Sequence, residues 1–303
     1  MVQKIPQDST QDVPVKKDIC AIVTTYNPDE EFPVRIARTQ SQVQHIVIVD
    51  DGATTINISR LVGWFSNCPD IHLIHHELNK GVAAALNTGM NWAIENGFTH
   101  ALLLDDDSLI CLETVNVMLA SYKYIHGSPL TILGTNYGIS KIFSREDNPG
   151  RSVGVSSVIT AGTLIPLQVF DLVGPFREDF FIDYVDHEYC LRARAHGVTI
   201  HKCLDANMDQ PIGQTLKVAY GELSSIHSPI RTYYFFRNSF AVIQEYIWKY
   251  PRFSAWIVWQ QVKTIVKILG FLRPKRHYWN ALTRGLQDGY CKRFGRIPEE
   301  ILR

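Results

Sequence analysis

The feature that most constrains the fold is a regular alternation of short apolar runs with segments of helical spacing. Five runs rich in branched residues are predicted strands: Ile19–Thr25, His45–Val49, Ile71–His75, Ala101–Leu104 and Thr131–Gly134. Four segments with helical spacing lie between them: Glu30–Gln42, Ile56–Asn67, Val82–Asn96 and Leu112–His126. This alternation is typical of an α/β fold with a mostly parallel central sheet. Farther along, the pattern predicts a strand over Val158–Pro166 and a helix over Asp183–His196.

Composition excludes several classes of protein. Thirty basic residues balance thirty acidic ones, so the net charge does not indicate nucleic-acid binding. Six scattered cysteines form no C-x-x-C pair, which predicts neither a zinc site nor a disulfide framework and favours buried thiols in a reducing compartment. No stretch reaches the roughly 20 apolar residues that span a bilayer, and the polar N-terminus lacks the apolar core of a signal peptide. We therefore expect a protein of the cytoplasm or of its membrane surface.

The strand over Ala101–Leu104 runs directly into Asp105, Asp106 and Asp107. Three carboxylates at the end of a buried strand are electrostatically costly unless a cation shares the site. Asp105 and Asp107 are two residues apart, so in extended chain they point the same way. Their oxygens suit Mg²⁺ or Mn²⁺, which also binds the phosphates of a nucleotide. The alternative is a solvated acidic turn that caps the following helix.

Polar motifs follow the other strands of the first half. They are Thr24-Thr25-Tyr26-Asn27-Pro28, Asp50-Asp51-Gly52 and Asn79-Lys80-Gly81-Val82. Open α/β sheets bind ligands at the carboxyl ends of their strands, glycine allows close approach, and the helix start near Val82 favours phosphate. Each motif alone could be a turn or a cap. Their combination favours a nucleotide site.

Several of these motifs carry a family resemblance. Asp50-Asp51-Gly52, Asn79-Lys80-Gly81-Val82-Ala83 and Asp105-x-Asp107 resemble family 2 glycosyltransferases of the GT-A fold. The bacterial rhamnosyltransferase branch of that family is similar in three later motifs: Ala161–Pro166, Phe181–Arg192 and His227–Asn238. The resemblance covers about residues 18–245 and implies a GT-A fold with a C-terminal helical appendage.

The resemblance implies a role for each matched position. Asp51, with Asp50 beside it, would read the pyrimidine base. The rest of the donor pocket would comprise Thr25, Tyr26, Asn27, Lys80, Gly81, Asp105 and Asp106. Asp105 and Asp107 would hold Mg²⁺ or Mn²⁺ on the diphosphate. Asp186 falls where the family has its catalytic base, in a Glu-Asp motif whose first position is Val185 here.

The chemistry of an inverting transfer agrees with that assignment. It needs a base to deprotonate the acceptor hydroxyl and a cation to offset charge on the departing phosphate. If Asp183 lies in the predicted helix, it shares a face with Asp186, and Glu188 is turned aside. The alternative is that these acids only complement the helix dipole. For Asp183 and Glu188 the two interpretations remain open.

One position departs from the family pattern. Family members commonly carry a histidine after the base, in a His-x-x-Gly motif that often joins the metal. The corresponding stretch is Asp209-Gln210-Pro211-Ile212-Gly213, so glutamine replaces the histidine. Either the metal coordination is looser, or His227 contributes instead.

The C-terminal region combines aromatic residues with cations. From Glu245 to Arg303, twelve Lys and Arg residues stand against four Asp and Glu. Lys249, Arg252, Lys263 and Lys267 are interleaved with apolar residues over Phe240–Leu272. This pattern is typical of helices in an anionic membrane interface. The alternative is a pair of amphipathic helices packed on the core or on a second subunit.

The sequence thus predicts three parts: a disordered leader over 1–17, a catalytic domain over 18–238 and a basic helical region over 239–303. Within the catalytic domain, about 18–135 would bind nucleotide and about 152–238 the acceptor. We expect L-rhamnose transfer from dTDP-L-rhamnose to a lipid-linked or polymeric glycan of O-antigen or capsule type, on the inner face of the membrane. The alternatives are donors such as UDP-galactofuranose, UDP-glucose or UDP-N-acetylglucosamine, or a non-catalytic nucleotide- or glycan-binding scaffold. Homo-oligomers stay possible.

Overall fold

A computed structural model describes residues 14–122, 125, 130–137, 150–209, 214–218, 221–226 and 228–298. The strands are β1 (Ile19–Thr25), β2 (His45–Asp50), β3 (Ile71–His75), β4 (His100–Asp105), β5 (Leu109–Ile110), β6 (Thr131–Tyr137), β7 (Ser152–Gly154), β8 (Thr163–Pro166), β9 (Thr199–Asp209), β10 (Gln214–Val218) and β11 (Gly221–Ile226). The helices are α1 (Phe32–Gln40), α2 (Thr55–Phe65), α3 (Val82–Glu95), α4 (Thr114–Tyr122), α5 (Leu167–Val173), α6 (Val185–Ala195), α7 (Pro229–Tyr246), α8 (Pro251–Gly270) and α9 (Lys275–Tyr290). Two short 3₁₀ helices cover Lys16–Asp18 and Glu178–Phe180. Of the predicted leader, residues 1–13 lie outside the described part.

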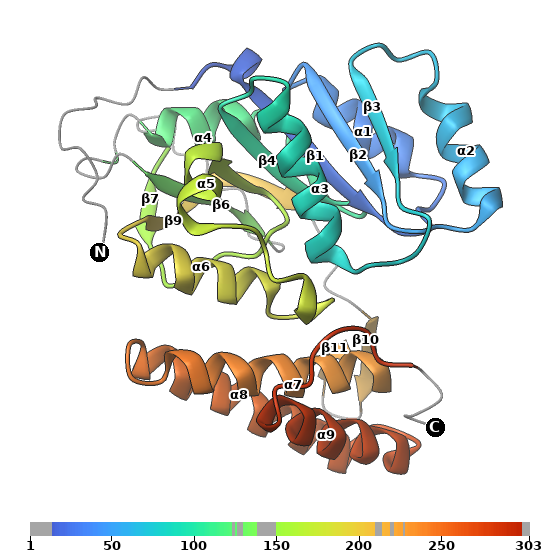
Figure 1. Cartoon of the computed structure of the whole chain (residues 1–303), viewed down its shortest axis with the longest axis vertical. Helices are drawn as coiled ribbons and strands as arrows, with labels where there is room; N and C mark the ends of the chain where they lie inside the picture. The colour runs from blue at the N-terminus through green and yellow to red at the C-terminus, as the bar shows by residue number, and fades with distance from the viewer. Residues whose placement is uncertain are drawn as a thin grey trace.

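A nine-stranded sheet forms the centre of the molecule, in the order β3-β2-β1-β4-β8-β6-β9-β5 with β7 paired to β9 (Figure 1). β1 pairs in parallel with β2 and β4, and β6 pairs in parallel with β9. β8 runs antiparallel between β4 and β6. The predicted α/β fold with a mostly parallel sheet is therefore confirmed.

The central strand explains why the sheet is covered on both faces. Every residue of β1 is buried. Cys20 and Ile22 pack into one core with α3, whereas Ile19, Ala21 and Val23 pack into a second core with α1 and α2. Alternate side chains of a strand point to opposite faces, so a continuous apolar run is the pattern of a strand between two helical layers.

Near the site, two predicted elements begin later in the structure than the sequence pattern indicated. The strand predicted over Val158–Pro166 begins only at Thr163, because a turn precedes it: Gly162 has φ +73° and the Thr163 amide donates to the Thr160 carbonyl. The helix predicted over Asp183–His196 begins at Val185, because Asp183 and Tyr184 are left-handed at φ +61° and +64°. Asp183 and Asp186 therefore do not share a helical face.

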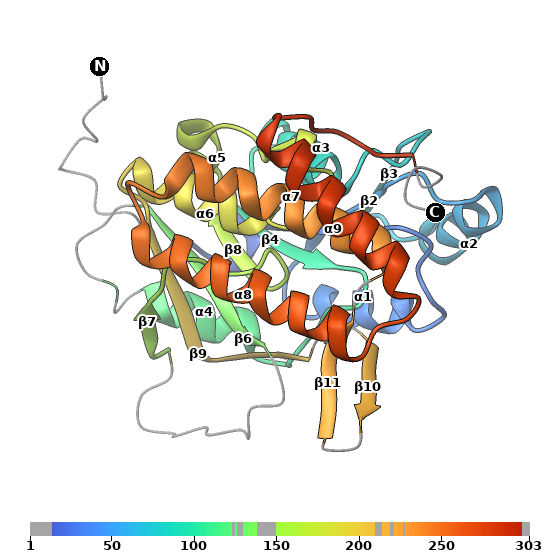
Figure 2. The ribbon, with the colours of Figure 1, turned by 90° about the horizontal axis from the view of Figure 1, so that it is seen from below.

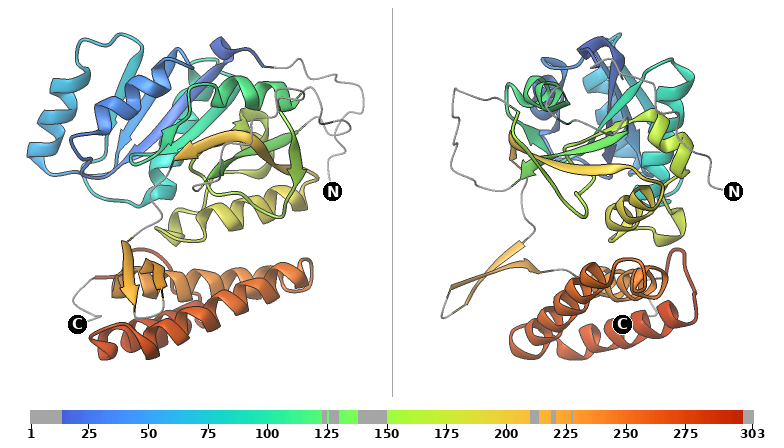
Figure 3. Two further views of the ribbon diagram at one scale, coloured as in Figure 1. Left: turned by 180° about the vertical axis from the view of Figure 1, so that it is seen from behind. Right: turned by 90° about the vertical axis from the view of Figure 1, so that its left-hand side faces the viewer.

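The C-terminal helices form a separate layer beside α6, below the carboxyl ends of the central strands in the view of Figure 1 (Figures 1 and 3). α9 packs closely on α7, where a Cβ atom on Gly285 would stand 2.6 Å from the Tyr233 carbonyl oxygen. The predicted domain boundary at 238/239 falls inside α7, which begins at Pro229. No helix among the described residues is both long enough and apolar enough to cross a bilayer.

The six cysteines are all free thiols. Cys20, Cys190 and Cys203 are buried, as the sequence led us to expect, whereas Cys111 and Cys291 are exposed. Burial raises the pKa of the Cys20 and Cys190 thiols to about 12. Both thiols therefore stay protonated and behave as small apolar side chains.

The start of α3 generates a stability prediction. Gly81 has φ +95°, and a Cβ atom there would stand 2.4 Å from the Phe181 carbonyl oxygen. We expect Gly81→Ala to lower the free energy of unfolding by about 2–4 kcal/mol, because backbone strain adds to a clash with backbone. Urea denaturation measures the change.

A matched control separates those two effects. Gly97 has φ +79°, but a Cβ atom there would have no other atom within 4 Å, so Gly97→Ala carries strain alone. We expect a loss of about 1–2 kcal/mol there. Equal losses in the two variants would contradict the close contact between Gly81 and Phe181.

Candidate functional site

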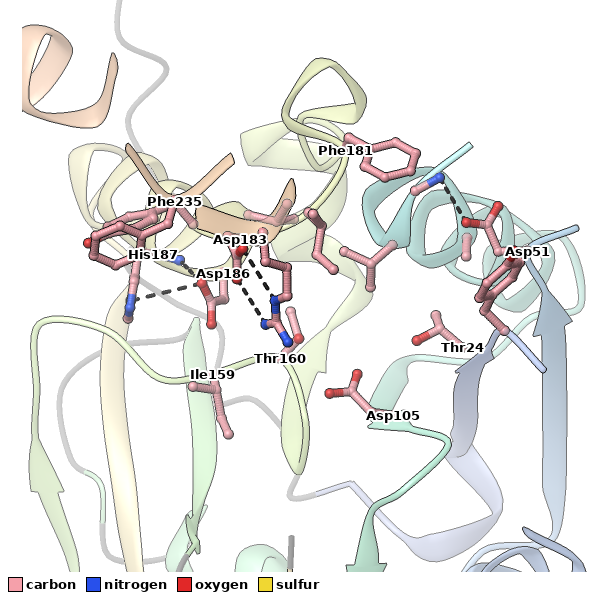
Figure 4. Close-up of a pocket in the computed structure, with 18 of the residues that line it drawn as sticks. Thr24, Asp51, Asp105, Ile159, Thr160, Phe181, Asp183, Asp186, His187 and Phe235 are labelled. Atoms are coloured by element: carbon pink, nitrogen blue, oxygen red, sulfur yellow. Dashed lines mark hydrogen bonds and ion pairs between the residues drawn. The ribbon is translucent and has the colours of Figure 1, made fainter. Parts of the chain in front are cut away.

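A cavity of about 830 Å³ lies at the carboxyl ends of the central strands, between the sheet and the C-terminal layer (Figure 4). Eight of the sequence-predicted site residues line it: Thr25, Tyr26, Asp51, Gly81, Asp105, Asp106, Asp107 and Asp186. Residues of α7 and α8 close the side opposite the sheet. The two acidic groups predicted from sequence thus lie around one cavity.

The first acidic group is built where β1 and β4 end side by side. Asp106 accepts hydrogen bonds from the Thr25 hydroxyl at 2.9 Å and the Tyr26 amide at 3.2 Å. Burial raises the pKa of the Asp106 carboxyl, and these two bonds oppose that effect. Asp106 therefore ties the two strand ends together, while Asp105 points into the cavity (Figure 4).

Asp51 anchors the start of α3. Its carboxylate accepts hydrogen bonds from the backbone amides of Lys80 at 2.9 Å and Gly81 at 2.8 Å, and His76 Nδ1 lies 3.0 Å from it. The Val82 amide donates to the Phe181 carbonyl at 3.0 Å. Protein acceptors therefore already take the backbone amides of Lys80, Gly81 and Val82, which the sequence suggested for phosphate.

Three predicted donor residues are not among the residues that line the cavity. Asp50 is buried, with one oxygen 2.6 Å from His75 Nδ1, and burial raises its pKa. The Asn27 side chain accepts from the Thr54 amide. The Lys80 backbone amide donates to Asp51.

The second acidic group comes from the turn before α6. Asp183 forms an ion pair with Arg231 of α7 at 2.9 Å. Asp183 raises the pKa of the Arg231 guanidinium, and Asp105 and Asp107 add smaller contributions of the same sign. Arg231 therefore lies in the field of both acidic groups. Phe181, Asp183 and Tyr184 all have positive φ in this turn, a concentration of strained backbone that is typical of functional sites.

Asp186 faces the cavity from the first turn of α6 (Figure 4). One of its oxygens accepts the His187 amide at 2.7 Å, and His187 Nδ1 lies 4.0 Å from the same oxygen. The His187 ring is fixed by Ser157 at 2.9 Å and by edge contacts with Phe253 and Trp256 of α8. The helical layer therefore helps to hold the segment that carries Asp186.

Glu188 has a structural partner instead of a place in the cavity. It is buried, and it pairs with Arg192 at 3.0 Å and accepts a hydrogen bond from Tyr246 at 3.0 Å. The prediction that Glu188 is turned aside from Asp186 agrees with this arrangement. Its charge is balanced within the packing of α6 on α7.

The donor set at the end of β4 fits a divalent cation shared with a ligand. Within the described residues, no three His, Cys, Asp or Glu side chains gather as a protein-only metal site. Asp105 and Asp107 both line the cavity, and Mg²⁺ typically takes one or two carboxylates together with phosphate oxygens and water. Gln210 and His227, the two candidates for the family's histidine role, lie outside the described residues.

Several cavity residues were not predicted as site residues, and two of them, Lys263 and Lys267, were expected at a membrane interface instead. Arg231 lies in the His227–Asn238 motif, but the sequence alone does not predict its ion pair with Asp183, which is 48 residues away. Trp256, Gln260, Lys263, Thr264 and Lys267 line the cavity from α8. Their spacing of three or four residues along a helix is the signal that could have identified them as one face.

Known proteins resemble this chain in sequence and in fold. Residues 20–125 match the family described as "Glycosyl transferase family 2". The dTDP-rhamnosyl transferase RfbF of Shigella flexneri is 31% identical over 248 residues, which span 76% of this chain and 81% of that protein.

Solved structures support the fold. Residues 1–349 of TarS from S. aureus superpose with a TM-score of 0.57 at 13% identity, covering 93% of this chain and 82% of that one. GalNAc-T7, crystallised with UDP, GalNAc and Mn²⁺, gives a TM-score of 0.52 at 10% identity; the match spans 63% of this chain and 43% of that longer chain. The match in sequence to a rhamnosyltransferase over most of both chains decides the family. This chain is a glycosyltransferase and belongs to glycosyl transferase family 2.

Proposed function

We propose that this protein transfers L-rhamnose from dTDP-L-rhamnose to a lipid-linked or polymeric glycan acceptor, with inversion at the anomeric carbon. The sugar and nucleotide are proposed from the likeness to the Shigella dTDP-rhamnosyl transferase. One structural observation carries the mechanism: Asp105, Asp107 and Asp186 line a single cavity although they come from different elements. A donor held at the end of β4 would then meet an acceptor held beside α6.

In this mechanism Asp186 is the general base. Its carboxylate takes the proton of the acceptor hydroxyl as that oxygen bonds to the anomeric carbon. The bond from the anomeric carbon to the β-phosphate oxygen breaks, and the electron pair leaves with dTDP. Attack from the face opposite dTDP inverts the anomeric configuration. His187 has a positioning role, because its amide holds one oxygen of the base.

Charge on the departing diphosphate needs cationic partners. Arg231 lines the cavity, and its guanidinium is held by Asp183 in the field of Asp105 and Asp107. We assign it to the phosphate oxygens of the leaving group, which a guanidinium binds well. Asp105 and Asp107 would hold Mg²⁺ or Mn²⁺, which would offset further negative charge on the diphosphate when bound.

The C-terminal layer suits contact with a membrane surface. α8 exposes Trp259, Val262 and Val266, and basic residues such as Arg273, Lys275 and Arg276 follow it. Apolar side chains beside cations favour an anionic bilayer interface.

Cosedimentation should therefore detect binding of the protein to anionic vesicles. We expect Trp259→Ser with Val266→Ser to weaken this binding about tenfold or more, since each apolar side chain buried in the bilayer contributes about 1.5–3 kcal/mol. Val34→Ser changes an exposed residue on α1 and should bind vesicles as the wild type does. Unchanged vesicle binding of the Trp259/Val266 variant would exclude this face of α8.

A panel of donors tests the proposed reaction. Purified protein with Mg²⁺ is given dTDP-rhamnose, UDP-galactofuranose, UDP-glucose or UDP-N-acetylglucosamine together with a bacterial lipid-linked glycan extract. We expect dTDP-rhamnose alone to give a product, read by mass spectrometry as the mass gain of one deoxyhexose. Product from a UDP-sugar and none from dTDP-rhamnose would reject the rhamnosyl donor while leaving the class of enzyme intact. Nucleotide binding without any turnover would favour a scaffold.

Removing the base provides a second prediction. Asp186→Asn keeps the shape of the side chain but cannot accept the hydroxyl proton. We expect kcat to fall by about 10²–10⁴-fold, the usual contribution of a general base, with dTDP affinity unchanged in calorimetry. Asp171→Asn makes the same change at an exposed site on α5 and should keep full activity. A wild-type rate for Asp186→Asn would show that another group is the base.

A further inference from the structure

The helix α8 presents three different faces along its length. Its cavity face, as we call it below, consists of Trp256, Gln260, Lys263, Thr264 and Lys267. Its packed face holds the buried residues Ser254, Ile257 and Ile268 together with Gln261, which donates a hydrogen bond to Ser239 of α7. With 3.6 residues per turn, these faces point in directions roughly a third of a turn apart.

The remaining third of the helix is an exposed apolar stripe of Val258, Trp259, Val262, Val266 and Leu269. Trp259 is 59% exposed and Val266 57%, although side chains of this kind are usually buried. Figure 2 shows α8 on the near side of the molecule when it is seen from below, beside α7 and α9. By the helical spacing above, the apolar stripe runs beside the cavity face over residues 258–267.

The cavity face carries two cations one turn apart. Lys263 and Lys267 both line the cavity. Burial lowers the pKa of Lys267, and repulsion from Lys263 lowers it further. Two ammonium groups at this spacing repel each other, so an anion between them would be stabilised. Across the cavity, Asp105, Asp107 and Asp186 supply the negative charge and Arg231 a further cation.

We propose that Lys263 and Lys267 form an acceptor subsite for the phosphate or diphosphate of a lipid-linked sugar, whose hydrocarbon chain runs along the apolar stripe. This inference rests on the proposed function, in which the end of β4 receives the donor diphosphate. The occupant must be an anion joined to an apolar chain, because Lys263 and Lys267 of the cavity face lie beside the apolar stripe. The sugar of that acceptor then extends from α8 into the cavity, where Asp186 lies.

The test uses farnesyl diphosphate as the probe, with binding to the full-length protein measured by calorimetry. We expect Lys263→Ala with Lys267→Ala to weaken farnesyl diphosphate binding by about tenfold or more, since two charge-assisted contacts are lost. The affinity for dTDP with Mg²⁺ should not change. Farnesol and inorganic diphosphate, each of which lacks half of the probe, should both bind more weakly than farnesyl diphosphate.

A matched control removes two cations elsewhere. Lys16→Ala with Lys17→Ala changes two cations in the 3₁₀ helix before β1 that do not line the cavity, and should leave farnesyl diphosphate binding intact. Equal probe affinity in the wild type and the Lys263/Lys267 variant would overturn the proposal. An equal loss of dTDP affinity would also overturn it, because the lysines would then serve the donor.

Failure of the acceptor subsite can be distinguished from failure of the proposed reaction. If no donor gives product but probe binding still depends on Lys263 and Lys267, the subsite stands and the proposed reaction fails. If dTDP-rhamnose gives product but the two lysines do not affect probe binding, the reaction stands and the subsite fails.

Discussion

The site depends on a buried pair of side chains, Arg237 and Asn238 of α7. Arg237 is 1% exposed and donates to the carbonyls of Asp179, Phe180 and Gly295. The Asn238 amide donates to three carbonyls of the same turn, those of Phe180, Ile182 and Asp183. Buried carbonyls need such partners, because an unpaired one costs about 1–3 kcal/mol. These bonds hold the strained turn before α6 and fix the helical layer against it.

The turn held in this way links the two halves of the cavity. On one side its Phe181 carbonyl accepts the Val82 amide at the start of α3, whose neighbouring amides bind Asp51. On the other side it leads into α6 and Asp186. A displacement of the turn would therefore move the donor side and the proposed base together. The cavity is one unit for this reason, although its residues come from distant parts of the chain.

The sequence predicted most of the sheet, because its strands are continuous apolar runs buried on both faces, as in β1. Because strand ends gather at one edge, it also predicted that Asp51, Asp105 and Asp107 lie near one another, whereas Asp50, predicted with them, does not line the cavity. It failed where long-range bonds override local preference. The left-handed Asp183 is held by Arg231 and Asn238, and no helical spacing reveals either contact. Likewise the sequence near Val82 favours a phosphate site, but in the structure Asp51 and the Phe181 carbonyl accept the hydrogen bonds of the Gly81 and Val82 amides.

In the proposed reaction, one cavity holds a donor diphosphate at Asp105 and Asp107, opposite Asp186 as base. The most direct measurement is a crystal structure with dTDP and Mn²⁺, in which anomalous scattering locates the metal. We expect Mn²⁺ to be bound by a carboxylate of Asp105 or Asp107 and by the diphosphate, with Asp186 across the cavity on the open side of the β-phosphate. Nucleotide and metal bound elsewhere, or a diphosphate turned away from Asp186, would contradict it.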